Sequence, residues 1–419
     1  MYKPLENKKI LVAVSGGIAC YKSIYLVRLL IKQGVDVHVV MTKNAMKFIT
    51  PLTFQALTAN HVWVDEWDSY ADNNMAHINL TRGIDAIILA PASANTIAKI
   101  NHGIADNLLC STVLARIKSI PILIAPAMNV EMWTSPASIR NISQLKQDGY
   151  IILEPQNGEQ ACGEFGQGRM LEPEAILDDI IYHLTAKNLK NKNIVITAGS
   201  TQEYIDPIRY ISNASSGKMG LALAKQAYYR GASVTLIYGN IDKSQTGAGL
   251  EFLAKIKSIK VISADEMYNQ VMNIYQSDNA NITKNDIFIG VAAVADWMPQ
   301  NTSPNKQKKT DNQHKNHIEL VKTKDILAAV ADINPKPICI GFAAETQNLA
   351  EYAKIKLINK KLDLIIANLI SDSFAKDTNK VCIISKHNIN ASEVSIEQIA
   401  EMDKASLANI ILDKLTVNL

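Results

Sequence analysis

The chain has 419 residues, a length that favours two or three domains over a single hydrophobic core. Hydrophobic residues make up 47% and charged residues 20%, which is typical of soluble globular proteins and disfavours disordered, collagenous and coiled-coil classes. The formal net charge of +3 is too small for a dedicated nucleic-acid-binding protein. The opening apolar run ends at Val14, far short of a membrane span or a secretion signal, so we expect a cytoplasmic protein without membrane or nucleic-acid partners.

The five cysteines are scattered along the chain and contain no C-x-x-C pair. This pattern disfavours both a disulfide framework and a structural zinc site. Each thiol therefore has to be interpreted separately, and Cys20 and Cys110, which lie in apolar helical surroundings, are expected to be packing residues.

The first predicted elements are a strand over 10–14, a turn made by Ser15, Gly16 and Gly17, a helix that ends near Gly34, and a strand over 35–41. Backbone N–H groups at a strand-to-helix turn favour an anionic ligand. The turn lacks the G-x-G-x-x-G spacing, so a tight turn without a ligand is an equally good interpretation of the glycines alone.

Polar motifs follow the next two predicted strands, over 84–90 and 122–125. The first motif, over 91–99, reads PASANTIAK, and the second, over 126–133, reads PAMNVEMW. Ligands of doubly wound sheets bind at the carboxyl ends of the strands, which is where both motifs lie. Asn129 in the second motif has a simpler alternative role as a helix cap.

Cys162 lies in a third motif, over 161–170, in which three glycines predict a flap. A thiol with the reference pKa of about 8.5 is mostly protonated at neutral pH and can donate a proton. His77 belongs to a fourth stretch, over 75–78, and its near-neutral reference pKa suits proton transfer, although a lone histidine is more often structural.

Together these stretches resemble the FMN-dependent cysteine decarboxylases, specifically phosphopantothenoylcysteine decarboxylase, over about the first 185 residues. The resemblance implies that His77 is the active-site histidine, that Asn129 binds the substrate carboxylate, and that Cys162 donates a proton. It also implies that FMN oxidises the substrate thiol before carbon dioxide leaves and then returns the electrons. The candidate FMN-binding residues are Ser15, Gly16, Gly17, Thr42, Ser93, Ser111 and Thr112.

A polar stretch over 185–192 predicts a junction, after which the opening pattern recurs: a strand over 194–197, a break, a helix from 216–217 to Gly231, and a strand over 234–238. Short apolar runs over 287–291, 338–342 and 364–367 alternate with helical stretches. The alternation predicts an α/β protein with two parallel, doubly wound, Rossmann-like sheets, in domains spanning 1–189 and 190–419.

The segment over 206–220 concentrates small hydroxyl residues, glycines and a lysine before a helix, which favours phosphate binding. It is not a Walker A loop, because Ser212 stands where that motif requires glycine. With the stretches over 292–297, 306–309, 323–326 and 341–346, it resembles phosphopantothenate-cysteine ligase. A decarboxylase followed by a ligase is the arrangement of the bacterial bifunctional proteins of coenzyme A biosynthesis.

The second resemblance implies that CTP activates 4′-phosphopantothenate as an acyl-cytidylate, which cysteine then attacks. Asn213 would hold that intermediate and Lys306 would neutralise phosphate charge; without the resemblance, Lys306, Lys308 and Lys309 would be interpreted as a solvated charge run. The resemblance assigns the nucleotide to Gly290, Val291, Ala292, Asp296, Lys306, Thr323, Lys324, Asp325, Ile326, Phe342, Lys356 and Lys360.

Asp296 would reach the nucleotide through Mg²⁺. Met298 and Gln307 depart from the family pattern in this loop. The resemblance further implies a homo-oligomer with trimeric decarboxylase contacts and dimeric ligase contacts. The alternative functions are an FMN oxidoreductase and a non-catalytic flavoprotein regulator, because folds of this class serve many redox roles.

Overall fold

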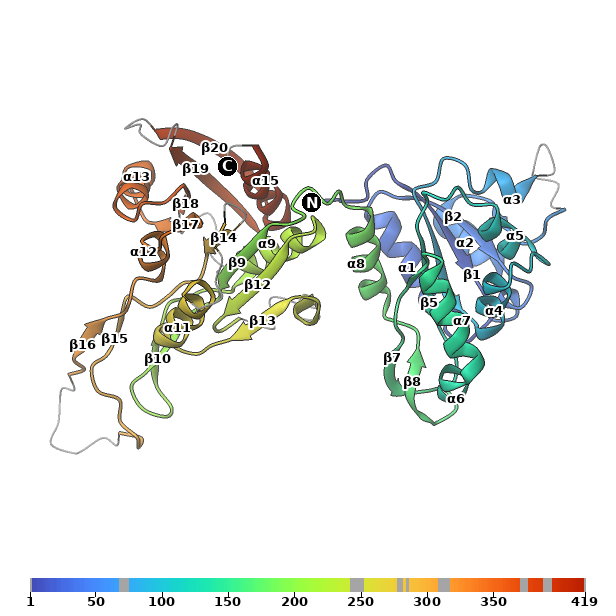
Figure 1. Ribbon diagram of the computed structural model, residues 1–419, viewed down its shortest axis with the longest axis horizontal. Helices are drawn as coiled ribbons and strands as arrows, with labels where there is room; N and C mark the ends of the chain where they lie inside the picture. The colour runs from blue at the N-terminus through green and yellow to red at the C-terminus, as the bar shows by residue number, and fades with distance from the viewer. Residues whose placement is uncertain are drawn as a thin grey trace. The chain divides into compact units, whose positions relative to one another are not determined.

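The computed structural model describes residues 2–67, 75–241, 252–276, 282–283, 286–307, 317–369, 376–386 and 394–417. It divides into two compact units, one over Lys3–Thr185 and one that combines Ala186–Leu419 with the first two residues (Figure 1). Within the described ranges, no helix has the length and apolar character needed to cross a membrane.

The first unit contains a six-stranded parallel sheet in the order β3-β2-β1-β4-β5-β6. The strands β1, β4 and β5 are almost entirely buried and apolar, as expected where helices cover both faces of a parallel sheet. After β1 the chain adds β2 and β3 on one side of this strand, and it then crosses back to add β4, β5 and β6 on the other side. This reversal of strand order creates a topological switch point at the carboxyl end of β1. The strands are β1 (Lys9–Val14), β2 (Asp36–Met41), β3 (Val62–Trp63), β4 (Ala86–Ala92), β5 (Ile122–Pro126) and β6 (Ile151–Ile152).

The helices of this unit begin and end at the residue types expected from the sequence. Proline occupies the first turn of α2, α7 and α8, where its missing N–H is not needed. Gly34, with a φ of 80°, follows the end of α1. The helical segments are α1 (Cys20–Lys32), η1 (Ala45–Lys47), α2 (Pro51–Thr58), α3 (Ala76–Asn79), α4 (Ala94–Asn101), α5 (Leu108–Leu114), α6 (Val130–Thr134), α7 (Pro136–Gln147) and α8 (Pro173–Leu184), and a separate hairpin is formed by β7 (Gln156–Glu159) and β8 (Phe165–Arg169).

The second unit contains an eight-stranded sheet in the order β13-β12-β9-β14-β17-β18-β19-β20. The six strands from β13 to β18 are parallel, which confirms the predicted doubly wound architecture of both units, and β19 and β20 extend the sheet in antiparallel fashion. The sequence analysis did not predict this extension: β20 is exposed over most of its length and lacks an apolar run, and the buried apolar run over 381–384 in β19 was not interpreted as a strand. The strands are β9 (Asn193–Ala198), β12 (Ser233–Tyr238), β13 (Lys257–Lys260), β14 (Asp286–Gly290), β17 (Ile338–Glu345), β18 (Leu364–Leu369), β19 (Thr378–Lys386) and β20 (Val394–Asp403).

Helices α9 (Lys218–Tyr229), α11 (Ala264–Tyr275), α12 (Ile326–Ala331), α13 (Leu349–Asn359) and α15 (Lys404–Val417) pack on this sheet. Two small hairpins project from it and contact each other (Figure 1). One joins β10 (Gln202–Tyr204) to β11 (Tyr210–Ser212), and the other joins β15 (Trp297–Pro299) to β16 (Leu320–Lys322). The predicted loop over 300–317 connects β15 to β16, and its residues 308–316, including Lys308 and Lys309, lie outside the described residues.

Candidate active sites

The turn after β1 is tied to the end of β4 by one buried side chain. The Oγ of Ser15 donates to the carbonyl of Pro91 at 2.8 Å and accepts from the N–H of Ser93 at 2.8 Å. Ser93 in turn caps α4. A Cβ added to Gly17 would meet no atom within 4 Å, so there is open space beside this residue. The turn therefore lies at the switch point of the sheet, with room for a ligand against its backbone.

Three further candidate flavin-binding residues have hydroxyl groups in different environments. The Oγ1 of Thr42 accepts from the N–H of Ala45 at 3.2 Å, and the Oγ of Ser111 donates to the carboxylate of Glu66. Thr112, on α5, is fully buried, and its Oγ1 has no hydrogen-bond partner among the described residues. An unpaired buried hydroxyl typically costs about 1–3 kcal/mol, so a polar ligand atom at this position would be favourable. These residues fit a flavin nucleotide.

Asn129 uses the two ends of its carboxamide differently. Its Oδ1 accepts from the N–H of Glu131 at 2.8 Å and caps α6, which confirms the capping role. Its Nδ2 faces the flap and donates to the Sγ of Cys162 at 3.4 Å and to the carboxylate of Glu164. The cap fixes the direction of the amide, so its Nδ2 is held toward the flap that carries Cys162.

The glycines beside Cys162 hold the β7–β8 hairpin close to the segment that carries Asn129. A Cβ on Gly168 would lie 2.3 Å from the carbonyl oxygen of Met128, and the N–H of Met128 donates to the carbonyl of Gly168 at 3.0 Å. Gly163, with a φ of 85°, forms the turn itself. Close backbone approach, in addition to the turn, therefore explains why this motif is rich in glycine.

Cys162 differs from the other four cysteines because it is exposed. Cys20 and Cys110 are buried, which confirms that they are packing residues. His77 lies half-buried on α3, which packs against α5 and thus near the hydroxyl groups of that helix. Among the described residues, the hydrogen-bond partners of Asn129 and Cys162 do not include His77.

The second unit contains a cavity of about 920 Å³ at the carboxyl ends of its central strands. Its lining joins the loop before α9 to the ends of β14 and β17, the start of α12 and the face of α13. The volume is at the upper end of the range for small-molecule sites. It brings together all but one of the residues predicted for the ligase: Asn213, Gly290, Val291, Ala292, Asp296, Thr323, Lys324, Asp325, Ile326, Phe342, Lys356 and Lys360.

Lys356 of α13 and Lys360, the residue that follows the last residue of this helix, give one side of the cavity a positive charge. The Nζ of Lys356 donates to the carbonyl of Phe342 at 2.9 Å, and Lys360 forms an ion pair with Asp325 at 2.7 Å. Burial, together with the nearby charge of Lys360, lowers the pKa of Lys356. Burial alone would raise the pKa of Asp325, but the contact with Lys360 lowers it. An anionic ligand here would favour the protonated form of Lys356.

Asn213 follows β11 and reaches the cavity from the hairpin side, where its Nδ2 donates to the carbonyl of Val294 at 2.9 Å. The helix behind it approaches the sheet closely, because a Cβ on Gly220 would lie only 2.5 Å from the Cβ of Ala198. This contact sets the N-terminus of α9 directly over the end of β9.

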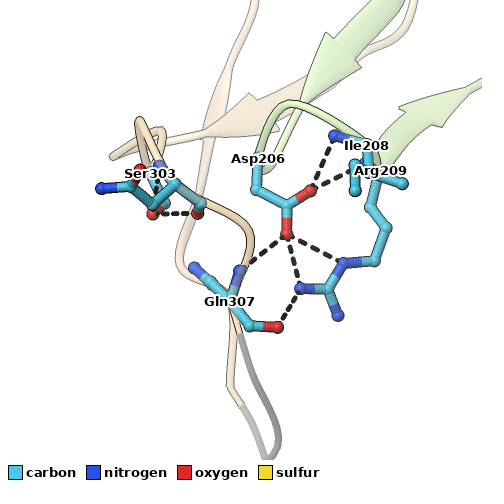
Figure 2. Close-up of polar contacts among 6 residues, drawn as sticks. Asp206, Ile208, Arg209, Ser303 and Gln307 are labelled. Carbon is cyan, nitrogen blue, oxygen red and sulfur yellow. Dashed lines mark hydrogen bonds and ion pairs between the residues drawn. The ribbon is translucent and has the colours of Figure 1, made fainter.

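Lys306 is the predicted ligase residue that does not line this cavity, and its side chain is exposed. Its neighbour Gln307 is held by the β10–β11 hairpin, as Figure 2 shows. Gln307 donates its N–H to the Oδ2 of Asp206 at 3.2 Å, and its carbonyl accepts from the Nη2 of Arg209 at 2.8 Å. The buried Asp206 carboxylate also accepts from the guanidinium and the N–H of Arg209, and these bonds hold its pKa well below the usual range.

No cluster of three or more His, Cys, Asp or Glu side chains suited to a metal ion occurs in the described part of the chain. Asp296 is exposed and contributes one carboxylate to the cavity. Mg²⁺ commonly takes one or two protein carboxylates together with substrate phosphates and water. Asp296 fits a magnesium ion that is brought by a nucleotide, rather than a resident ion held by protein ligands.

Comparisons with known proteins agree with the division of the chain into two units. Residues 1–185 match the family described as Flavoprotein, and residues 189–418 match the DNA/pantothenate metabolism flavoprotein C-terminal domain. The Coenzyme A biosynthesis bifunctional proteins CoaBC of Bacillus subtilis and Escherichia coli are 43% and 44% identical to the chain, and the alignments cover 91% and 90% of both partners. The chain belongs to the CoaBC family. The Haemophilus influenzae member is 41% identical over 98% of both chains.

Membership of the CoaBC family makes the chain a flavoprotein and a bifunctional enzyme of coenzyme A biosynthesis, with phosphopantothenoylcysteine decarboxylase and phosphopantothenate-cysteine ligase activities. Among solved structures, the C-terminal domain of a CoaBC protein is 33% identical, covers 55% of this chain and 97% of its own, and superposes with a TM-score of 0.43. A cysteine-to-serine variant of PPC decarboxylase, complexed with pantothenoylaminoethenethiol, is 32% identical, covers 41% of this chain and 96% of its own, and has a TM-score of 0.38.

The cavity also contains residues that the sequence motifs did not reveal. Asn368 directly follows the predicted strand over 364–367, so the rule that ligands bind at carboxyl ends of strands was sufficient to find it. Asn379 and Lys404 also line the cavity. They belong to the start of β19 and to the first turn of α15, and neither directly follows a strand that the sequence predicted.

Proposed function

We propose that the second unit joins 4′-phosphopantothenate to cysteine with CTP, and that the first unit decarboxylates the product, 4′-phosphopantothenoylcysteine, with FMN. The observation that carries the ligase assignment is the cavity that gathers Asn213 after the β10–β11 hairpin, the glycine-containing end of β14, and two lysines, one in α13 and one just after it. The contact between Asn129 and Cys162 carries the decarboxylase assignment.

In the ligase reaction, an oxygen of the 4′-phosphopantothenate carboxylate attacks the α-phosphorus of CTP, and pyrophosphate leaves. The amine nitrogen of cysteine then bonds to the acyl carbon, the bond from that carbon to the phosphate oxygen breaks, and CMP leaves with the electron pair while the amine releases a proton. Asn213 orients the acyl-cytidylate through its amide. Lys356 and Lys360 place positive charge beside the nucleotide, and Asp296 would hold a magnesium ion that would neutralise phosphate charge.

CTP, rather than ATP, is the proposed nucleotide because of the fused decarboxylase–ligase architecture. The triphosphates are identical, so selection depends on contacts to the base. The backbone around Gly290–Ala292 and the strand residue Phe342 are the proposed base readers. A site that hydrogen-bonds one base leaves polar groups unpaired when it is offered another, which produces strong discrimination.

In the decarboxylase reaction, Asn129 holds the carboxylate that is lost. A neutral amide orients this group without stabilising its charge as strongly as an arginine would, which suits a group about to leave as carbon dioxide. Bound FMN would supply the reversible oxidation of the substrate thiol. Ser15, Gly17 and Thr112 would hold the cofactor at the switch point, His77 would handle a proton, and the exposed Cys162 would protonate the product.

Mass spectrometry of the products formed from 4′-phosphopantothenate, cysteine and CTP tests both assignments. We expect pyrophosphate, CMP, carbon dioxide and 4′-phosphopantetheine, and no net consumption of a nicotinamide cofactor. If ATP is used as well as CTP, the nucleotide assignment is wrong. Net oxidation of NADH or NADPH would favour an FMN oxidoreductase, and binding without turnover would favour a non-catalytic regulator. Light scattering tests the predicted trimeric and dimeric contacts.

A further inference from the structure

The β7–β8 hairpin is joined at several points to the segment that carries Asn129. Helix α6, which follows Asn129, contacts β8 (Figure 1). The Oε1 of Gln160 accepts from the N–H of Val130 at 3.0 Å, and a Cβ on Gly166 would lie only 2.5 Å from a methyl carbon of Val130. The turn of the hairpin is therefore held against this segment.

The turn presents two functional side chains from one short loop. The N–H of Gly163 donates to the carbonyl of Gln160 at 2.9 Å, and the N–H of Gln160 donates to the carbonyl of Glu164 at 2.7 Å. These two hydrogen bonds close the loop around Cys162, and Gly163 supplies the left-handed conformation that the turn needs, with a φ of 85°. Cys162 and Glu164 are therefore positioned together.

The carboxylate of Glu164 lies at the amide of Asn129. The Nδ2 of Asn129 donates to the Oε2 of Glu164, and the Sγ of Cys162 donates to the same oxygen at 3.7 Å. Within the described ranges, this exposed carboxylate forms no ion pair that would neutralise its charge. The Oδ1 of Asn129 is used by the helix cap, so its Nδ2 is the part of the amide that is left for a ligand.

A substrate carboxylate bound at Asn129 would need the same Nδ2. Two carboxylates at one neutral amide repel each other, so the substrate binds there in exchange for Glu164. Decarboxylation reverses the exchange. The bond between the substrate carbon and its carboxyl group breaks, the electron pair stays on the substrate, and carbon dioxide leaves as a neutral molecule. Asn129 has then lost its anionic partner, and Glu164 can return.

We propose that Glu164 is a positioning residue that makes protonation follow decarboxylation. While the substrate carboxylate occupies Asn129, Glu164 is displaced, and the thiol of Cys162 on the same closed loop is displaced with it. When Glu164 returns, the Sγ of Cys162 again lies 3.4 Å from the Nδ2 of Asn129, beside the place that the carboxylate has left. The thiol proton then passes to the carbon that lost the carboxyl group. This inference rests on the proposed roles of Asn129 and Cys162 and adds what sets their order.

The test follows the two steps separately in the full-length, FMN-loaded protein with 4′-phosphopantothenoylcysteine. Rapid quenching of a single turnover measures carbon dioxide release, the enethiol that decarboxylation leaves, and 4′-phosphopantetheine. The variants are Glu164→Ala, which removes the contact, and Glu164→Gln, which keeps an acceptor without the charge. The matched control is Glu159→Ala, at an exposed position of β7 that is not among the described hydrogen-bond partners of Asn129 or Cys162.

We expect Glu164→Ala to lower the KM for 4′-phosphopantothenoylcysteine about two- to tenfold, because the substrate no longer has to displace a carboxylate. The Ki of 4′-phosphopantetheine, which lacks the carboxylate, should not change. Carbon dioxide release should keep the parental rate, whereas 4′-phosphopantetheine should form about tenfold more slowly and the enethiol should accumulate. Glu164→Gln should lie between Glu164→Ala and the parent, and Glu159→Ala should match the parent.

The proposal is overturned if Glu164→Ala raises the KM for 4′-phosphopantothenoylcysteine, since Glu164 would then help to bind the substrate. It is also overturned if this variant forms 4′-phosphopantetheine at the parental rate, or if it slows carbon dioxide release and product formation equally, as a general disturbance of the flap would. Two different results would contradict the roles on which the proposal rests. They are an Asn129→Ala variant with the parental KM, and a Cys162→Ser variant with normal turnover.

Discussion

Two adjacent glycines in the turn after β1 distinguish packing within the protein from contact with the flavin. A Cβ on Gly16 would lie 2.6 Å from the Cβ of Asn44 and 2.9 Å from its backbone carbon. Carbon atoms in contact prefer separations of about 3.5–4.0 Å, so the backbone at Asn44 would have to move by roughly 1 Å. A Cβ on Gly17 would meet nothing within 4 Å. Gly16→Ala therefore strains the protein, whereas Gly17→Ala adds a methyl group that only a ligand would meet.

The size of the first effect follows from the cost of overpacking. Inserting a methyl group into a well-packed site typically costs about 1–3 kcal/mol. For a unit the size of Lys3–Thr185, this corresponds to a loss of about 2–12 °C in Tm. Gly17→Ala should change the Tm of the FMN-free protein by no more than about 2 °C, because surface substitutions without a clash are nearly neutral. Its effect should instead be weaker FMN binding.

The assay uses the full-length chain stripped of FMN. Calorimetry identifies the transition of the first unit as the one that FMN shifts, and a titration followed by flavin fluorescence gives the Kd. We expect Gly16→Ala to lower the Tm without ligand and Gly17→Ala to raise the Kd without lowering that Tm. Parental FMN affinity in Gly17→Ala would refute the placement of the flavin at this turn. An unchanged Tm in Gly16→Ala would refute the packing argument.

Three further predictions concern separate parts of the chain. His77→Asn should abolish decarboxylation and leave pyrophosphate release unchanged, since the two chemistries belong to different units; equal loss of both would contradict the assignment. Alkylation followed by mass spectrometry should label Cys162 first, because the other four thiols are buried and burial raises their pKa values, that of Cys339 to about 12; early labelling of Cys339 would contradict the structure. Asp206→Asn should slow ligation and leave decarboxylation unchanged. The asparagine amide has one acceptor oxygen, so it cannot accept all the hydrogen bonds that the carboxylate accepts from Arg209 and Gln307. Ligation at the parental rate would show that this network does not position the segment.

The sequence predicted the central parallel strands well because they are continuous apolar runs, whereas the short parallel edge strands β3, β6 and β13 were not predicted. The runs over 10–14 and 194–197 correspond to β1 and β9, with boundaries shifted by one residue. The antiparallel strand β20 escaped prediction for the opposite reason, whereas β19 contains a buried apolar run over 381–384 that the sequence analysis did not interpret as a strand. One face of an antiparallel edge is solvated, and β20 accordingly exposes most of its side chains.

The candidate sites were predictable where a motif follows a strand, because the carboxyl edge of a parallel sheet collects such loops. Asn213, Asp296 and Lys356 line one cavity from three different parts of the chain. Their separations in the sequence do not by themselves reveal that they lie close together. Asn379 could not be predicted in this way. It enters the cavity from the start of an antiparallel strand, and its unpaired oxygen becomes apparent only when burial is known.

Lys306 shows how a residue outside a cavity can still be connected to it. The β10–β11 hairpin carries Arg209 at its turn and leads directly into Asn213, which lines the cavity. The same hairpin binds the segment of Lys306 through Gln307 and the buried carboxylate of Asp206 (Figure 2). The carboxylate of Asp206 is buried, whereas the side chain of Arg209 is 49% exposed, so displacing the arginine or Gln307 would leave a buried charge without its partners. Lys306 is therefore connected, through its neighbour Gln307, to the same hairpin that leads into Asn213. A shift of this hairpin would move both predicted ligase residues.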